Sequence, residues 1–86
     1  MSSYHVEVDT AAAREIKRIN RADQKRILTK ITSLGANPRP QGCVKLSGQD
    51  SYRIRVGVYR IIYVIEDAVR VVTVSRVGHR KEVYRK

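Results

Sequence analysis

The chain has few of the residues that would place it in several common protein classes. Its 86 residues include one cysteine, two prolines and five glycines. The single cysteine, Cys43, excludes an internal disulfide and a cysteine-based zinc site. The scarcity of proline and glycine, together with 42% hydrophobic residues, indicates a globular chain rather than a disordered one. A chain this short has room for one core, so we expect a single domain over residues 1–86.

Long apolar runs are also missing. The runs present are short, such as Ile61 to Ile65, whereas a membrane-spanning helix needs about 20 apolar residues. The first five residues, Met1 to His5, contain no cationic stretch followed by an apolar segment, so they do not form a signal peptide. We therefore expect a cytoplasmic protein that does not enter a membrane.

Acidic residues are scarce as well. Eight Asp and Glu stand against 18 Lys and Arg, which gives a formal net charge of +10 and a sequence pI near 10.4. Twelve of the bases are arginines, the residue favoured where planar groups make paired contacts with phosphate. A charge excess of this size opposes folding by self-repulsion and indicates a polyanionic partner, most simply nucleic acid or a nucleoprotein. An acidic protein partner is compatible with it.

The first half of the chain predicts one strand and two helices. Apolar and polar side chains alternate from Tyr4 to Val8, which predicts a strand. Asp9 stands where a helix N-cap belongs. Asn20 predicts the cap of a second helix, which Gly35 ends as a C′ glycine. Without a linker between them, the helices form a hairpin. Their predicted buried faces carry Ala12, Ile16 and Ile19 in the first helix and Ile27, Leu28, Ile31 and Leu34 in the second.

The second half predicts strands. The segments 43–46, 52–56, 59–65 and 69–77 are rich in Val, Ile and Tyr. Gly57-Val58 suits a two-residue type II′ turn, and Asp67-Ala68 predicts a second turn. The element order β-α-α-β-β-β predicts the α+β class, a mainly antiparallel sheet with the helical hairpin on one face.

A turn at Gly57-Val58 would set Arg55 directly opposite Arg60, with Arg53 on the same face of the hairpin. The turn at Asp67-Ala68 would add Val71, Thr73 and Ser75 to that face. Opposed like charges are destabilising, and neither strand carries an acidic residue to neutralise them. We therefore predict an anion site there, although a merely solvated face remains the alternative. The opposite face, assigned to the core, carries Tyr52, Ile54, Val56, Tyr59, Ile61, Tyr63 and Ile65.

Two motifs resemble the RelE family of toxin–antitoxin ribonucleases. They are Tyr52-Arg-Ile-Arg-Val-Gly-Val-Tyr-Arg-Ile-Ile-Tyr63 and Val77-Gly-His-Arg-Lys-Glu-Val-Tyr84, and the helical hairpin and the segment 45–48 are similar too. The resemblance implies an endoribonuclease that cleaves mRNA in the decoding site of the ribosome and is neutralised by a cognate antitoxin, expected here to be acidic. It implies functional positions at Arg53, Arg55, Arg60, Arg80 and Tyr84, and we add Lys81 as a further RNA contact. Arginines with an aromatic ring on an open sheet are typical of single-stranded RNA recognition.

Cleavage by a 2′-hydroxyl needs a group that accepts its proton, and arginine is a poor choice because its pKa lies above about 12. Family members often carry lysine at the positions of Arg53 and Arg55. His79 is the candidate base, since a histidine ordinarily titrates near pH ~6.5, and Tyr84 is a weaker one. Alternatively, His79 only turns the chain or contacts RNA, and the ribosome or solvent takes the proton.

Two other functions remain open, a ParE-like inhibitor of DNA gyrase and a non-catalytic RNA-binding module. No glycine-rich phosphate loop, paired carboxylates or metal-ligand cluster is present, so we expect neither a metal nor an organic cofactor.

Overall fold

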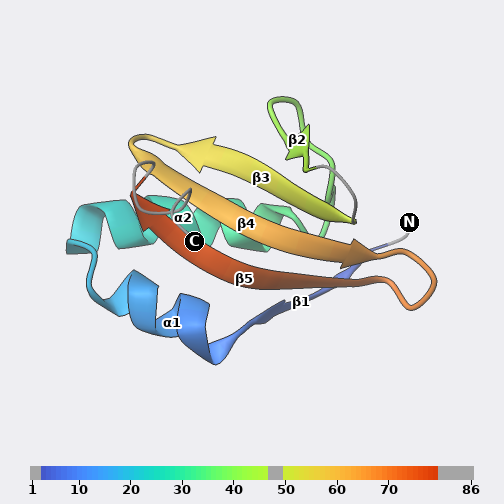
Figure 1. Ribbon diagram of the computed structural model, residues 1–86, viewed down its shortest axis with the longest axis horizontal. Helices are drawn as coiled ribbons and strands as arrows, with labels where there is room; N and C mark the ends of the chain where they lie inside the picture. The colour runs from blue at the N-terminus through green and yellow to red at the C-terminus, as the bar shows by residue number, and fades with distance from the viewer. Residues whose placement is uncertain (1–2, 47–49, 80–86) are drawn as a thin grey trace.

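The computed structural model describes residues 3–46 and 50–79 and has the α+β architecture predicted from the sequence. An N-terminal strand and two helices precede four strands, and all five strands share one sheet (Figure 1). None of the helices in these two segments is long and apolar enough to cross a membrane. The elements are β1 (His5–Val8), α1 (Thr10–Lys17), α2 (Arg21–Ser33), β2 (Val44–Lys45), β3 (Ser51–Val56), β4 (Tyr59–Glu66) and β5 (Val71–His79).

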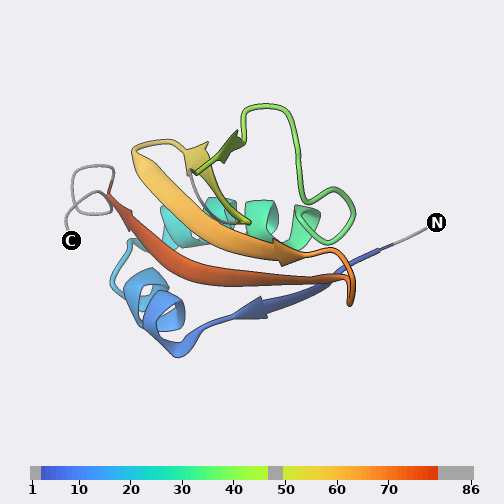
Figure 2. The same cartoon turned by 45° about the vertical axis from the view of Figure 1, so that its right-hand side comes forward.

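The strands lie in the order β1-β5-β4-β3-β2, which can be followed in Figure 2 after a turn of 45° from the view of Figure 1. The pairs β2–β3, β3–β4 and β4–β5 are antiparallel, as expected, and only β1 runs parallel to its neighbour, β5. At the other edge, the two residues of β2 pair only with Tyr52 and Arg53. The outer edge of β3 beyond Arg53 is therefore not covered by β2.

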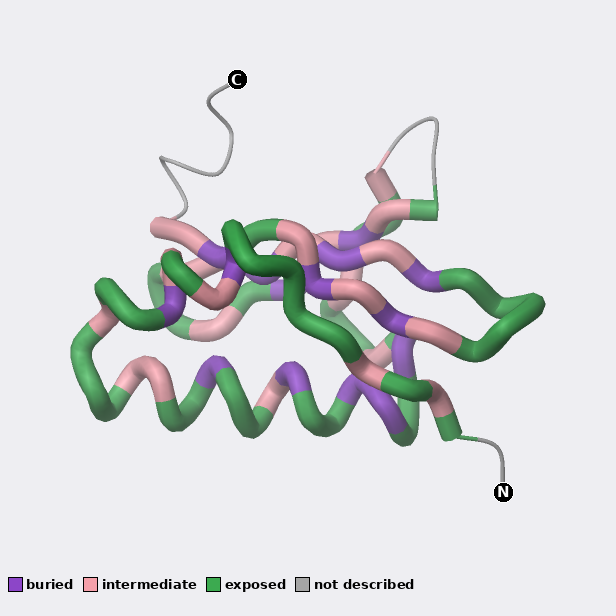
Figure 3. Tube along the Cα trace, turned by 90° about the horizontal axis from the view of Figure 1, so that it is seen from below, coloured by how far each residue is buried: buried purple, intermediate pink, exposed green. Residues whose placement is uncertain are grey.

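The helical hairpin forms as predicted, with one difference at each helix. The side chain of Asn20 caps α2 by accepting a hydrogen bond from the backbone N–H of Asp23 at 3.0 Å. Asp9 stands at the N-cap of α1, but its side chain makes no capping hydrogen bond. Leu28, predicted to be buried, is 46% exposed, because Ile27 and Ile31 already direct the neighbouring face of α2 to the sheet. Figure 3 shows the buried turns of α2 facing the strands.

Gly35 follows the C-cap residue of α2, Leu34, but not in the left-handed conformation that a C′ glycine usually adopts. The reason for a glycine here is space. A Cβ at this position would lie 3.1 Å from the carbonyl oxygen of Tyr4 and 3.3 Å from Cγ2 of Val6. The Tyr4 N–H donates to the Gly35 carbonyl at 2.7 Å, so the missing side chain lets the end of α2 pack directly against the start of β1.

The core lies between the hairpin and one face of the sheet, and the predicted alternation of β3 and β4 is confirmed. Val56 and Tyr59 are half-buried against this core. In β5, Val74 and Val77 are both buried although they are three positions apart, a spacing that would put them on opposite faces of a regular strand. A β-bulge opposite Ile62 and Tyr63 absorbs the extra residue. The buried hydrophobic residues that form this core are Ala12, Ile16, Ile27, Ile31, Leu34, Tyr52, Ile54, Ile61, Tyr63, Ile65, Val72, Val74 and Val77.

One of the two predicted turns is confirmed and the other is longer than expected. Gly57, in the first central position of the β3–β4 turn, has a φ of +61°, which glycine adopts without strain. The β4–β5 connection is not a two-residue turn at Asp67-Ala68. It spans residues 67–70, and Arg70 closes it with a φ of 57° and an N–H directed to the carbonyl of Asp67 at 3.3 Å.

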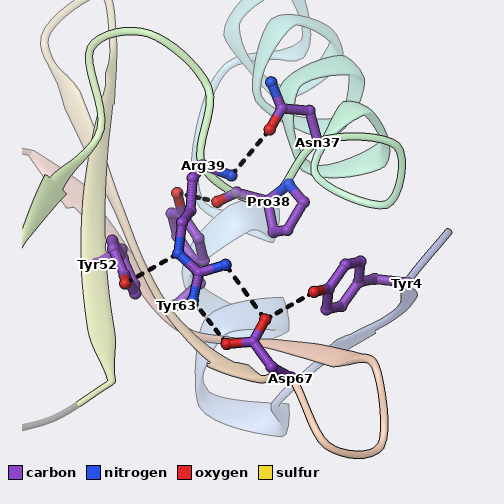
Figure 4. A network of polar contacts seen from close by, with 7 residues as sticks. All are labelled: Tyr4, Asn37, Pro38, Arg39, Tyr52, Tyr63 and Asp67. Atoms are coloured by element: carbon purple, nitrogen blue, oxygen red, sulfur yellow. Dashed lines mark hydrogen bonds and ion pairs between the residues drawn. The ribbon is translucent and has the colours of Figure 1, made fainter. Parts of the chain in front are cut away.

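Arg39 joins three distant parts of the chain (Figure 4). Its guanidinium makes two hydrogen bonds to the carboxylate of Asp67, at 2.8 and 3.2 Å, and a third to the hydroxyl of Tyr52 at 3.0 Å. Tyr4 donates to the same carboxylate at 2.6 Å, and the buried hydroxyl of Tyr63 donates to the carbonyl of Pro38 at 2.8 Å. The loop after α2 is thereby tied to the sheet and to the start of β1.

The Arg39–Asp67 contact predicts a pH dependence of stability. The hydrogen bonds from Arg39, and then from Tyr4, lower the pKa of Asp67 from 3.8 to about 2. A carboxyl whose pKa is lower in the folded state stabilises the fold fully above the unfolded value, and this contribution is lost as the pH falls through the folded value. We expect Asp67→Asn to lower the free energy of unfolding at pH 7 and to match wild type near pH 2.

Urea unfolding followed by circular dichroism between pH 7 and pH 2 measures this difference. Asp9→Asn is the matched control, because the Asp9 side chain makes no capping hydrogen bond. A gap between wild type and Asp67→Asn that stays constant down to pH 2 would contradict the prediction.

Candidate functional site

Three arginines lie on the face of the β3–β4 hairpin that is turned away from the helices. The predicted register is confirmed, with Arg55 directly opposite Arg60 and Arg53 opposite Ile62. Arg55 is exposed, whereas Arg53 and Arg60 are half-buried. We call Arg53, Arg55 and Arg60 the arginine face. Strand alternation places them there, because the core residues Ile54 and Ile61 occupy the other side.

Strand β5 continues this face as predicted, up to its bulge. Thr73 lies opposite Val64, and Val71 lies opposite Glu66. Ser75 lies at the bulge, where its hydroxyl donates to the carbonyl of Ile62 at 3.2 Å.

A hollow of about 370 Å³ opens beside the arginine face, at the free edge of β3. The described residues that line it include four cations and no carboxylate. One of these cations, Lys30, comes from α2 rather than from the sheet. No sequence signal could have found it, because its position depends on how α2 packs against β3. The lining residues are Lys30, Gln41, Gly42, Val44, Arg53, Ile54, Arg55 and Arg60.

Within residues 3–46 and 50–79, three carboxylates that pair with arginines lie away from this hollow. Asp67 pairs with Arg39 at 2.8 Å, Asp23 with Arg26 at 3.3 Å, and Glu15 with Arg76 at 2.9 Å, where it raises the pKa of Arg76. These contacts neutralise cations around the helices and the β4–β5 turn. The described lining of the hollow thus carries several positive charges and no carboxylate, which suits an anionic ligand.

His79 ends β5 and lies on the other side of the sheet. It is directly opposite Tyr59, whose ring it meets edge to face at 6.1 Å between centroids, while the neighbouring Gly78 lies opposite Arg60. His79 and Tyr59 line a separate hollow of about 280 Å³ together with Glu15 and Ile19 of the helical hairpin. The structure thus brings the three arginines together but does not bring His79 to them. Arg80, Lys81 and Tyr84 lie outside the described residues.

The chemistry open to the arginine face is anion binding and charge stabilisation. Guanidinium groups offer paired hydrogen bonds to phosphate oxygens and can stabilise the negative charge that develops on a phosphorane. Within residues 3–46 and 50–79, no three His, Cys, Asp or Glu side chains lie close enough to hold a metal ion.

Comparison with known proteins agrees with this geometry. The isolated RelE toxin of E. coli is 30% identical, with a TM-score of 0.78 over 95% of this chain and 92% of that one. The RelBE2 toxin–antitoxin complex of Mycobacterium tuberculosis contains a chain that is 25% identical, with a TM-score of 0.80 over 91% of this chain and 99% of that one. A RelB–RelE complex of Methanococcus jannaschii gives 26% identity and a TM-score of 0.75 over 91% and 94%.

A family model described as the ParE toxin of type II toxin–antitoxin systems matches residues 6–84, nearly the whole chain. The three solved structures named above are a RelE toxin and two complexes of such toxins with their antitoxins. Together with the predicted motifs and the confirmed fold, these matches establish that the chain belongs to the RelE/ParE toxin family of type II toxin–antitoxin systems.

Proposed function

We propose that this toxin is a ribosome-dependent endoribonuclease that cleaves mRNA in the A site. The observation that carries the proposal is the arginine face, where Arg55 and Arg60 oppose each other beside Arg53 without a neighbouring carboxylate in either strand. Such an arrangement costs stability unless an anion occupies it. The similarity to RelE toxins at 25–30% identity supports the same reading.

In this mechanism the mRNA 2′-hydroxyl gives up its proton and attacks the adjacent phosphorus, forming a 2′,3′-cyclic phosphate. The bond from phosphorus to the 5′-oxygen breaks, and that oxygen takes a proton from the ribosome or solvent and leaves as a hydroxyl. The arginines bind the phosphate and stabilise the extra negative charge of the transition state, since fixed donors aimed at developing charge lower the barrier. They do not accept the hydroxyl proton, because a guanidinium is not deprotonated in proteins. Arg80, Lys81 and Tyr84 remain proposed contacts to the RNA, with Tyr84 suited to stacking on a base.

Ribosomes programmed with a defined mRNA test the proposal, with cleavage ends mapped by primer extension. Cuts at the A-site codon support it. If Arg60 stabilises the transition state, Arg60→Ala lowers the single-turnover rate by about 10²- to 10³-fold, as the loss of an oxyanion donor does. A variant that cleaves within about threefold of wild type would remove Arg60 from this role.

Arg55→Thr separates loss of function from loss of folding in the same assay. Removing one of two opposed arginines should leave the free energy of unfolding unchanged or raise it by about a few tenths of a kcal/mol, while cleavage falls. Arg14→Ala, at an exposed position of α1, is the control for loss of one positive charge. Equal cleavage by all three proteins would contradict a role for the arginine face.

The proton acceptor is His79 or else a group of the ribosome or solvent. The position of His79 against Tyr59, on the helix side of the sheet, favours the ribosome or solvent. We therefore expect His79→Gln to keep the single-turnover pH–rate profile of wild type. A rate that climbs through one ionisation below about pH 6.5 in wild type, and not in His79→Gln, would instead assign the base to His79.

A second function, inhibition of DNA gyrase, is favoured by one observation, the match of residues 6–84 to a family model described as ParE. Supercoiling assays with purified gyrase test it. Inhibition of supercoiling without mRNA cleavage would replace the first proposal. Binding to ribosomes without either activity would leave a non-catalytic RNA-binding module.

We also infer that the partner of this toxin is an acidic antitoxin. The relatives from Mycobacterium tuberculosis and Methanococcus jannaschii were solved as toxin–antitoxin complexes, and a chain of net charge +10 attracts an acidic protein. Co-expression should relieve toxicity. Raising the salt concentration should slow association strongly and change dissociation little, as stopped-flow fluorescence can measure. A basic neighbouring gene product, or toxicity that persists on co-expression, would contradict the inference.

A further inference from the structure

We propose that Lys30 binds a backbone phosphate of the RNA strand that lies across the arginine face. The hollow beside β3 is then a subsite for one nucleotide, with sheet arginines on one wall and a helix lysine on the other. The inference rests on the proposed function in one respect, namely that the arginine face receives RNA.

The position of Lys30 differs from that of the other α2 bases near it. Lys25 and Arg26 are exposed, whereas Lys30 is half-buried beside the core residue Ile31. It lines the arginine hollow and also a second, mainly apolar hollow of about 580 Å³ that reaches Val56. A lysine placed between two such surfaces lays its methylene stem along the apolar one and extends its ammonium beyond it.

Among the described residues, the carboxylates that form ion pairs do not contact Lys30. No carboxylate within the described segments forms an ion pair with its ammonium. The acidic residue of α2, Asp23, instead accepts hydrogen bonds from Asn20 and Arg26. A fourth cation in a hollow that already holds three is unfavourable by repulsion, and an incoming phosphate reverses the sign of that interaction.

The hollow has the size and chemistry of a nucleotide subsite. Its volume of about 370 Å³ lies near the lower end of small-ligand pockets, which suits a single nucleotide of a strand. Gly42 lies at an open part of its rim, where a Cβ would have no neighbour within 4 Å, and its φ of +96° is one that favours glycine. The arginines offer paired donors to one phosphate, and a lysine supplies a compact point charge that suits another.

A purely structural role for Lys30 predicts different behaviour. It lies in the last turn of α2, where a cation is stabilised by the helix dipole. In that case its removal lowers the free energy of unfolding and leaves RNA affinity unchanged once the protein is folded. Binding measurements therefore separate the two roles.

The test measures the affinity of the full chain for a short single-stranded RNA with 2′-O-methyl groups, which cannot be cut by 2′-hydroxyl attack. Fluorescence anisotropy gives the dissociation constant over a range of salt concentrations. The variants are Lys30→Gln and Lys30→Arg, with Lys25→Gln as the matched control on the exposed side of the same helix. Circular dichroism confirms that each is folded at the assay temperature.

For single strands, each phosphate contact contributes about 0.7 to the slope of log affinity against log salt. We expect Lys30→Gln to reduce the slope by about 0.7. Over the tenfold range from ~1 M to ~0.1 M salt, that change in slope corresponds to about fivefold weaker binding at ~0.1 M salt. Lys30→Arg should bind as wild type does, and Lys25→Gln should keep the wild-type slope.

An unchanged slope in Lys30→Gln, an equal change in Lys25→Gln, or no measurable binding by wild type would overturn the inference. Failure of this inference can be distinguished from failure of the proposed function. Ribosomal cleavage with an unchanged Lys30→Gln slope keeps the function and removes the subsite. Lys30-dependent binding without cleavage keeps the subsite and removes the nuclease.

Discussion

The register of the β3–β4 hairpin is the constraint on which both the core and the candidate site depend. Gly57 allows the tight turn, and its φ of +61° sets Val56 opposite Tyr59. From that pairing, strict alternation sends Ile54 and Ile61 to the helices and Arg55 and Arg60 to the open face. A slip of one residue would bury arginines and expose isoleucines, so the cost of burying charge protects the register that assembles the site.

The two faces of the sheet have different roles, since one supports folding and the other concentrates positive charge. On the helix side, apolar burial drives folding, and ion pairs such as Glu15–Arg76 neutralise the cations at its margin. On the open side, positive charge is concentrated at a cost to stability. The hollow with Lys30 extends this charge beyond the sheet and onto a helix. Among the described residues, Glu15, Asp23 and Asp67 pair with arginines away from the hollow, and no carboxylate is among the described residues that line it.

The Arg39 cluster shows how a loop without regular structure is positioned beside such a site. Arg39 contacts Asp67 and Tyr52, and the next turn of the loop carries Gln41 and Gly42 to the rim of the hollow. Tyr63 adds a buried hydrogen bond to Pro38. Because several bonds hold the loop, the hollow is formed before any ligand arrives, and less ordering entropy is lost on binding.

The sequence by itself determined the elements whose signals are local. Alternation, the Asn20 cap and the Gly57 turn predicted the strands, the α2 start and the arginine face, because these features depend on neighbours in the chain. The predictions failed where tertiary contact decides. Gly35 is required by its approach to β1, and the β4–β5 turn lengthens to 67–70, where Asp67 meets Arg39.

The tertiary structure alone decided what shares the site. It set Lys30 beside the arginines and turned His79 to the opposite side, against Tyr59. It also placed a bulge in β5 so that Val74 and Val77 could both be buried. Contacts between a helix and a strand edge depend on packing angle and side-chain length rather than on spacing along the chain. Periodicity could therefore predict the arginine face but not the helix lysine that lines its hollow.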